Sequence, residues 1–140
     1  MEKITFVDNV TKANADTFNT MQDNIENAIN EIVESGSNAN GNYIKYNDGT
    51  MICYKEVSSS VAFDTTWGSL KEGSLELGNY AQEFITKPNV QITNISGVGA
   101  IIESFSPEPT KTSIGKLYVV RPTTYTGTVK IAVLATGRWK

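Results

Sequence analysis

The side chains best suited to acid–base or nucleophilic chemistry are scarce in this sequence. Its 140 residues contain no histidine, which removes the usual general base, the usual zinc ligand and the base of a Ser-His or Cys-His pair. Cys53 is the single cysteine, so we expect no intrachain disulfide and no cysteine cluster for zinc, and we predict a small buried apolar side chain. The sequence predicts neither a metal site nor a cofactor.

Two carboxylates alone suffice for glycoside hydrolysis. The acidic residues of the second part of the chain are Asp64, Glu72, Glu76, Glu83, Glu103 and Glu108. No two of them have a spacing that predicts convergence in space. A polysaccharide depolymerase is therefore disfavoured, and the chain is predicted not to be an enzyme.

Recognition of a saccharide is the chemistry that the side chains favour. It needs a flat apolar face and polar groups that hydrogen-bond to hydroxyls. In residues 121–125, Arg121 offers a fork of donors and Tyr125 a ring with a polar tip. Thr123 adds a hydroxyl, and Glu103 is expected to supply an acceptor from an earlier strand. The alternative is a surface ion pair between Arg121 and Glu103, with Tyr125 covering the edge of a sandwich.

A second candidate group surrounds Trp67. Its segment has a poor strand pattern, so Trp67 is predicted to be exposed on a loop, where an indole beside Asp64 suits a sugar ring. The alternative is that Trp67 plugs one end of the sandwich. Trp139 and Arg138, near the C-terminus, are instead predicted to close the core and to pair with a neighbouring chain.

The N-terminal part of the chain predicts one helix that would carry these groups. Asn14 is the expected N-cap, and Asp16 lies in the first turn, where the helix dipole favours an anion. Apolar residues then recur at spacings of three and four: Phe18, Met21, Ile25, Ala28 and Ile32. An average spacing of 3.5 predicts the seam of a parallel coiled coil, with three strands weakly favoured over two. The alternative is that this stripe packs onto the chain's own head.

Residues 35–41 are rich in Ser, Gly and Asn, which predicts the end of the helix and a flexible linker. The linker favours the multi-chain stalk, because a docked helix needs no spacer. Residues 1–40 are therefore predicted to form a trimerising stalk and linker, and residues 41–140 a head.

After Gly41 the apolar period changes to two. A hairpin is predicted around Asp48-Gly49, with residues 58–60 ending its second strand. Further strand-like runs lie at residues 83–86, 90–96, 100–105, 116–120 and 128–136. Many short strands separated by turn signals predict a mainly β chain folded as an antiparallel sandwich.

The charge pattern excludes several partners. The formal net charge is −3 and no basic stripe interleaves with the aromatic residues, so nucleic acid is not an expected partner. No run of about 18 apolar residues is present, so membrane insertion is not expected. The first five residues lack the pattern of a secretory signal.

Three segments resemble bacteriophage and prophage tail-fibre proteins. Residues 14–53 resemble the helix that leads into a "GxYxKxxDGTxxC"-type hairpin in the C-terminal domains of these fibres. Residues 84–92 are similar to the "F-x-x-x-P-x-V" segment of fibre heads related to the H-type lectin fold. Residues 129–140 resemble the closing strand of the same heads, which ends in "G-R-W". The order of the three segments along the chain is the stronger signal.

The resemblance implies a six-stranded antiparallel sandwich, three-fold assembly and carbohydrate binding at or near subunit interfaces. It implies a homotrimeric receptor-binding protein of a phage tail or tail-like particle, made in the bacterial cytoplasm. The head would attach to bacterial cell-surface polysaccharide, and the N-terminus to other tail or baseplate proteins. The alternative is a structural tail or baseplate component that binds no sugar.

Overall fold

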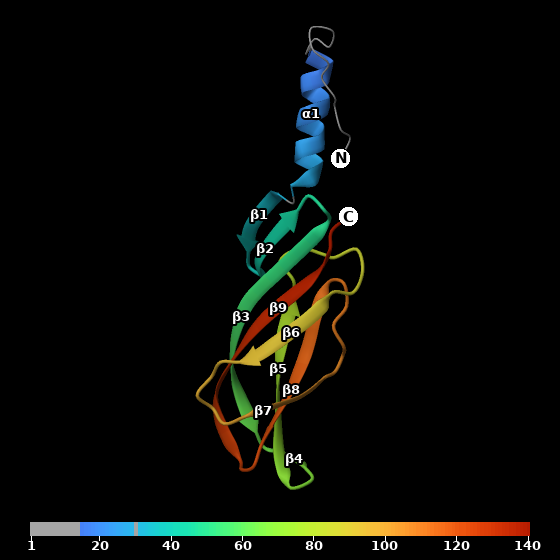
Figure 1. Ribbon diagram of the computed structural model, residues 1–140. Coiled ribbons are helices and arrows are strands. Elements are labelled where there is room, and N and C mark those ends of the chain that lie inside the picture. Colours follow the sequence, from blue (N-terminus) through green and yellow to red (C-terminus); the bar gives the residue numbers. More distant parts are fainter. Residues whose placement is uncertain (1–14, 30) are drawn as a thin grey trace.

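The computed structural model describes residues 15–29 and 31–140. Within them the chain forms one helix and nine strands arranged in two antiparallel sheets, so the mainly β prediction is confirmed (Figure 1). The resemblance implied six strands, and the structure has three more. The elements are α1 (Ala15–Ala28), β1 (Ile32–Asn38), β2 (Gly41–Tyr46), β3 (Thr50–Phe63), β4 (Thr65–Trp67), β5 (Leu70–Asn79), β6 (Asn89–Asn94), β7 (Ile101–Phe105), β8 (Ser113–Arg121) and β9 (Tyr125–Arg138).

The two sheets face each other as a sandwich-like fold. One sheet has five strands in the order β1-β2-β3-β9-β6, and the other has four in the order β4-β5-β8-β7. Strands β3 and β9 have 14 residues each and pair along their whole length, from Thr50 opposite Arg138 to Phe63 opposite Tyr125. This long pair runs the length of the head and connects its two ends.

Alternation along the strands builds the core between the sheets. In β9 the side chains of Val129, Ile131 and Val133 are buried while Lys130 and Thr136 are exposed, as the sequence pattern predicted. Cys53 is buried among them, which confirms the prediction of a small apolar role. The largest fully buried side chains belong to Phe63, Phe84, Met51, Leu77, Ile114, Leu117 and Ile131.

Two strand predictions were wrong. Residues 58–60 do not end a strand, because β3 continues through them, paired with residues 128–130 of β9. Residues 83–86 form no strand: Phe84 is a core residue held in a loop, where its N–H donates to the Lys111 carbonyl (2.9 Å). Apolar content alone cannot distinguish such a buried loop anchor from a short strand.

The Asp48-Gly49 turn between β2 and β3 was predicted correctly. Gly49 has a φ of +92°, which favours glycine. The Gly49 N–H donates to the Tyr46 carbonyl (3.1 Å), and the Asp48 carboxylate accepts from the Thr50 N–H (2.7 Å). These contacts close the hairpin that the change of apolar period and the Asp48-Gly49 pair predicted.

The helix ends at Ala28, earlier than the apolar spacing predicted. The Asn47 side chain donates to the carbonyls of Glu26 (3.3 Å) and Ile29 (2.5 Å), and its N–H donates to the Glu31 carbonyl (2.8 Å). The turn of the β2–β3 hairpin therefore supplies partners for the Glu26 carbonyl in the last turn of the helix and for the Ile29 and Glu31 carbonyls just beyond it. The Asn14 cap lies outside the described residues.

The predicted linker at residues 35–41 is wrong, and Ile32 is not a helix residue: residues 35–38 belong to β1, residues 39–40 form a turn, and Gly41 begins β2. Strand β1 pairs with β2 from Ile32 opposite Tyr46 to Asn38 opposite Gly41. The Asn38 side chain also donates to the Ala81 carbonyl (2.7 Å). The Ser, Gly and Asn residues were expected to form a flexible spacer because they do not continue a helix, but pairing with β2 overrides that preference.

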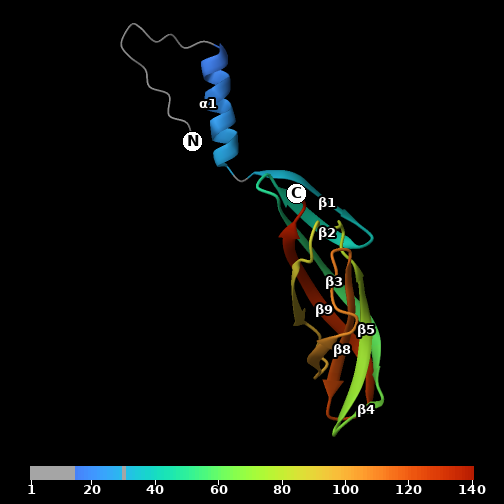
Figure 2. The same cartoon turned by 90° about the vertical axis from the view of Figure 1, so that its right-hand side faces the viewer.

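Helix α1 projects from the β1–β2 end of the head (Figures 1 and 2). Its apolar side chains remain exposed: Phe18 by 60%, Met21 by 38% and Ile25 by 51%. The stripe thus does not pack onto the chain's own head, and that alternative is not realised. In the described part of the chain, no helix has the length and apolar character that crossing a membrane requires.

Candidate functional site

Two cationic and two aromatic residues lie together at the end of the head farthest from α1. Lys71 and Arg121 lie opposite each other on β5 and β8, and Phe63 and Tyr125 lie opposite each other on β3 and β9. Cross-strand pairs share a face of their sheet. Phe63 is fully buried, and Arg121 lies two residues beyond the buried Val119, so both pairs belong to the inner faces. They lie between the two sheets at this end of the sandwich.

The Arg121 guanidinium is stacked on aromatic rings. Its Cζ lies 4.2 Å from the centroid of the Tyr125 ring and 5.8 Å from that of Phe63, within the range of cation–π attraction. The Arg121 Nε is buried and has no hydrogen-bond partner among the described residues. The side chain is thus held in place by packing while donors of the guanidinium remain unused.

Neither cation at this end forms an ion pair with another residue that the structure describes. Lys71 Nζ donates to the Thr66 hydroxyl (2.9 Å), a neutral partner. The ion pairs among the described residues are all elsewhere: Lys45–Glu34, Lys87–Glu108, Lys111–Glu83 and Lys116–Glu76. We call the group of Phe63, Lys71, Arg121 and Tyr125 the distal cluster.

Trp67 lies at the same end, on the hairpin of β4 and β5. It pairs with Leu70 across a turn at Gly68, so it belongs to a short strand and not to the predicted loop. Its exposure is confirmed: 49% of Trp67 and 45% of Tyr125 are accessible. Asp64 joins β3 to β4 and is also exposed. Trp67 therefore does not plug the sandwich.

Thr123 lies in the exposed connection between β8 and β9, between Arg121 and Tyr125. Five of the six predicted site residues therefore lie at the far end of the head: Asp64, Trp67, Arg121, Thr123 and Tyr125. Lys71 was missed because two glycines interrupt the alternation of apolar and polar residues in β5. Phe63 was missed because the predicted strand ended at residues 58–60.

Glu103 is not brought to Arg121. It lies in a bulge of the edge strand β7, where the pairing with β8 shifts between Ile102 and Ser104. Its carboxylate accepts a hydrogen bond from the Ser104 hydroxyl (2.5 Å). Neither the expected contribution of Glu103 to the site nor its ion pair with Arg121 is found among the described residues.

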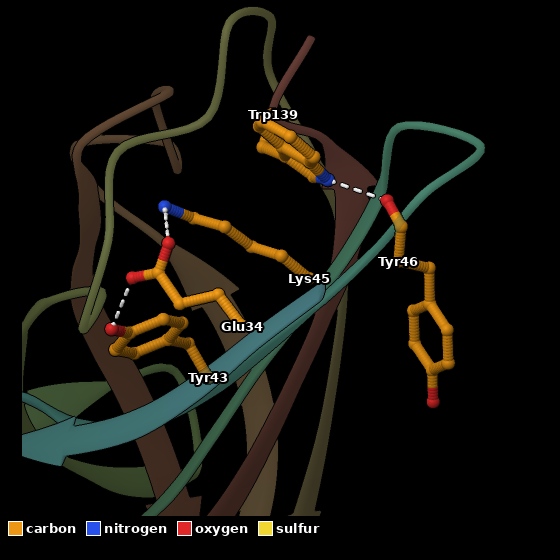
Figure 3. Close-up of polar contacts among 5 residues, drawn as sticks. All are labelled: Glu34, Tyr43, Lys45, Tyr46 and Trp139. Carbon is orange, nitrogen blue, oxygen red and sulfur yellow. Dashed lines mark hydrogen bonds and ion pairs between the residues drawn. The ribbon is translucent and has the colours of Figure 1, made fainter. Parts of the chain in front are cut away.

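A different polar cluster closes the end of the head nearest to α1 (Figure 3). The Glu34 carboxylate accepts from the Tyr43 hydroxyl (2.6 Å) and from Lys45 Nζ (3.2 Å). Lys45 Nζ also lies 5.5 Å from the centroid of a Trp139 ring. The Trp139 indole donates to the Tyr46 carbonyl (2.8 Å), on the strand that also carries Tyr43 and Lys45. We call Glu34, Tyr43, Lys45 and Trp139 the proximal cluster.

The polar groups of the proximal cluster have partners within the cluster or, for the Trp139 indole, at the Tyr46 carbonyl. The hydrogen bond from Tyr43, followed by that from Lys45, lowers the pKa of Glu34 below its ordinary value, while the Glu34 carboxylate raises the pKa of Tyr43. The Lys45 side chain is only 16% exposed, and its charge has a carboxylate partner. Trp139 packs against the core, as predicted for the C-terminal tryptophan.

An open cavity of about 570 Å³ lies between the end of α1 and the β2–β3 turn. Its lining includes the acidic residues Glu26, Glu31 and Asp48 and the terminal Lys140. Over residues 15–29 and 31–140, no group of three or more His, Cys, Asp or Glu side chains could hold a metal ion. The cavity is therefore not a candidate metal centre.

Comparisons with known proteins leave the chain without an assigned family. No family model matches the sequence, and no curated protein and no solved structure matches it either. The resemblance to phage tail fibres therefore rests on the three sequence segments alone.

Proposed function

We propose that the protein is a homotrimeric attachment protein of a phage tail or tail-like particle, and that its head binds bacterial cell-surface polysaccharide. The observation that carries this proposal is the placement of two exposed surfaces at opposite ends of one chain. Helix α1, which carries the apolar stripe, is at one end, and β4, which carries Trp67, is at the other (Figure 1). Such an arrangement suits a protein that assembles at one end and binds at the other.

The stripe of α1 supports self-assembly. Phe18, Met21 and Ile25 are spaced by three and four residues on a helix that no strand of the head covers. Exposed large apolar side chains in register mark an interface, and the matching surface is the same stripe on a second and third chain. The proposed trimer is parallel, with an H-type-lectin-like head on each helix. The N-terminal part would attach to other tail or baseplate proteins.

The far end supports saccharide binding. Trp67 and Tyr125 offer half-exposed rings that can cover the C–H faces of a sugar. The Arg121 guanidinium, the Asp64 carboxylate and the Thr123 hydroxyl supply donors and acceptors at the same end. Three heads carried side by side would add avidity to a weak individual contact.

A structural tail or baseplate component is the second candidate. Such a component would be expected to bury its aromatic side chains inside the head. The exposure of Trp67 and Tyr125 favours the binding function instead.

Binding to immobilised bacterial cell-wall polysaccharides and to a glycan array tests the proposal. The Trp67→Ala and Tyr125→Ala variants should each bind about tenfold more weakly, because each loses an aromatic contact surface. Tyr54→Ala is the matched control, because Tyr54 is 44% exposed on β3 but lies near the other end of the head. An absence of saturable binding to any bacterial surface polysaccharide would refute the function. Equal losses in all three variants would refute the site.

A further inference from the structure

We propose that the ligand of the distal cluster is anionic, a saccharide chain that bears carboxylate or phosphodiester groups, and that Arg121 and Lys71 bind its charge. The inference rests on the proposed function, since it specifies the ligand of the same site. It goes beyond that function because neutral polysaccharides would satisfy the aromatic contacts equally well.

The contrast between the two ends of the sandwich is the first argument. Both ends place cations on the inner faces of the sheets: Lys45 at the proximal end, and Arg121 with Lys71 at the distal end. Lys45 is paired with the Glu34 carboxylate at 3.2 Å, whereas no carboxylate pairs with Arg121 or Lys71 in the described part of the chain. A partly buried cation without an anion is costly unless another molecule supplies one.

The geometry of Arg121 is the second argument. The Tyr125 ring covers the guanidinium at 4.2 Å and fixes its plane. Arg121 Nε is buried without a partner, although buried donors are almost always satisfied. Because Nε is buried, a ligand reaches the guanidinium through its two terminal nitrogens, and their edge can bind a carboxylate or a phosphate with two parallel hydrogen bonds. A bound anion would supply the charge partner that the described residues do not.

Lys71 reinforces this preference from the neighbouring strand. It lies directly opposite Arg121, on the same face of the sheet, and among the described residues its Nζ donates only to the neutral Thr66 hydroxyl. The adjacent Glu72 pairs with Val120, and alternation turns it to the other face. Two positive charges therefore lie on an inner face at the distal end of the sandwich, even though the whole chain has a net charge of −3.

Titration calorimetry of the full chain with three probes tests the proposal. The probes are oligogalacturonate for carboxylate, a glycerol phosphate oligomer for phosphodiester, and dextran as a neutral chain. We expect at least one anionic probe to bind, with an affinity that falls as salt is added, and dextran to bind at least about tenfold more weakly. Which anionic probe binds identifies the source of the charge.

Substitutions then locate the charge contact. Arg121→Gln should weaken anionic binding by about tenfold or more, and Arg121→Lys should restore part of it because the charge remains while the fork is lost. Lys130→Gln is the matched control, since it removes one exposed positive charge from β9, away from the distal cluster. If Arg121→Gln fails to fold, Lys71→Gln provides the same comparison, because Lys71 forms no ion pair within residues 15–29 and 31–140.

The outcomes separate this inference from the proposed function. Equal binding of dextran and the anionic probes, or equal affinities of the Arg121→Gln and Lys130→Gln variants, would overturn the anionic ligand and leave saccharide binding in place. Failure to bind any bacterial polysaccharide would instead overturn the proposed function itself.

Discussion

The ring of Tyr125 lies against the backbone of Gly127 and fills the space that a side chain at Gly127 would occupy. Both residues are on β9, two positions apart and therefore on the same face. Because Gly127 has no side chain, the ring can fold along the strand towards the Arg121 guanidinium. The glycine thus sets the position of the aromatic surface in the distal cluster.

The first prediction follows from this contact. Gly127→Ala should displace the Tyr125 ring and weaken saccharide binding about as much as Tyr125→Ala does. Gly97→Ala is the matched control, because a Cβ at Gly97 would meet no atom within 4 Å. Binding to an immobilised polysaccharide measures both, and unchanged binding by Gly127→Ala would show that the ring position does not matter.

The second prediction concerns assembly. Light scattering should give a mass of about 46 kDa, three times the chain mass of 15.3 kDa. The Phe18→Asp and Ile25→Asp variants should shift the population towards the single-chain mass, because a charge in the seam is not tolerated. Asn19→Asp is the control, since Asn19 is exposed on the same helix outside the apolar stripe. A single-chain mass for the unchanged protein at micromolar concentration would contradict the stalk.

The position of the far-end residues was easier to predict from the sequence than the strands were. Residues 121–125 read as a polar loop between two apolar runs, and an antiparallel connection of that kind lies at an end of a sandwich. Strand β5 was missed because Gly73 and Gly78 interrupt its alternation. Gly73 is required there by packing: a Cβ would collide with Val61 on the facing sheet. Such a contact across the core leaves no local signal in the sequence.

The error at the end of the helix has a different physical origin. The apolar spacing continues from Ile25 to Ile32, so local periodicity favours a helix throughout. The hydrogen bonds that end α1 come from Asn47, about twenty residues further along the chain. A cap supplied by a distant turn cannot be recognised from a local window.

The third prediction concerns a buried hydroxyl. Tyr80 is a core residue whose hydroxyl has no hydrogen-bond partner among the described residues, and burial raises the pKa of Tyr80 to about 12. Tyr80→Phe should leave the free energy of unfolding unchanged or raise it by up to about 1 kcal/mol, because the substitution removes an unsatisfied polar group. The T-shaped contact of the ring with Phe84 would remain.

Tyr43→Phe is the counterpart, because the Tyr43 hydroxyl donates to Glu34 at 2.6 Å. It should lower the free energy of unfolding, as measured from urea unfolding curves of both variants. A clear loss of stability in Tyr80→Phe would mean that its hydroxyl has a partner after all.

The fourth prediction is a pH dependence in the proximal cluster. Hydrogen bonds from Tyr43 and Lys45 lower the pKa of Glu34 from its ordinary value of 4.5. Because the unfolded chain then binds the proton more tightly, this contribution is fully present above that value and is lost as pH falls through the lowered pKa of the folded state. Stability should therefore decrease on acidification below about pH 5.

Urea midpoints of the unchanged protein and of Glu34→Gln measure this effect. The difference between the two should be largest near neutral pH and should shrink at low pH. Glu56→Gln is the control, since Glu56 is exposed on β3 and belongs to no ion pair among the described residues. A constant difference across the pH range would show that the Glu34 charge does not contribute.

Tryptophan fluorescence during titration with a bound polysaccharide tests the central claim most directly. The chain has two tryptophans, Trp67 exposed near the distal cluster and Trp139 packed against the core in the proximal cluster. If saccharide binds at the far end, the ligand-dependent change in emission should disappear in Trp67→Phe and persist in Trp139→Phe. The reverse pattern, with the change retained in Trp67→Phe and lost in Trp139→Phe, would place the ligand at the end next to α1 and contradict the proposed site.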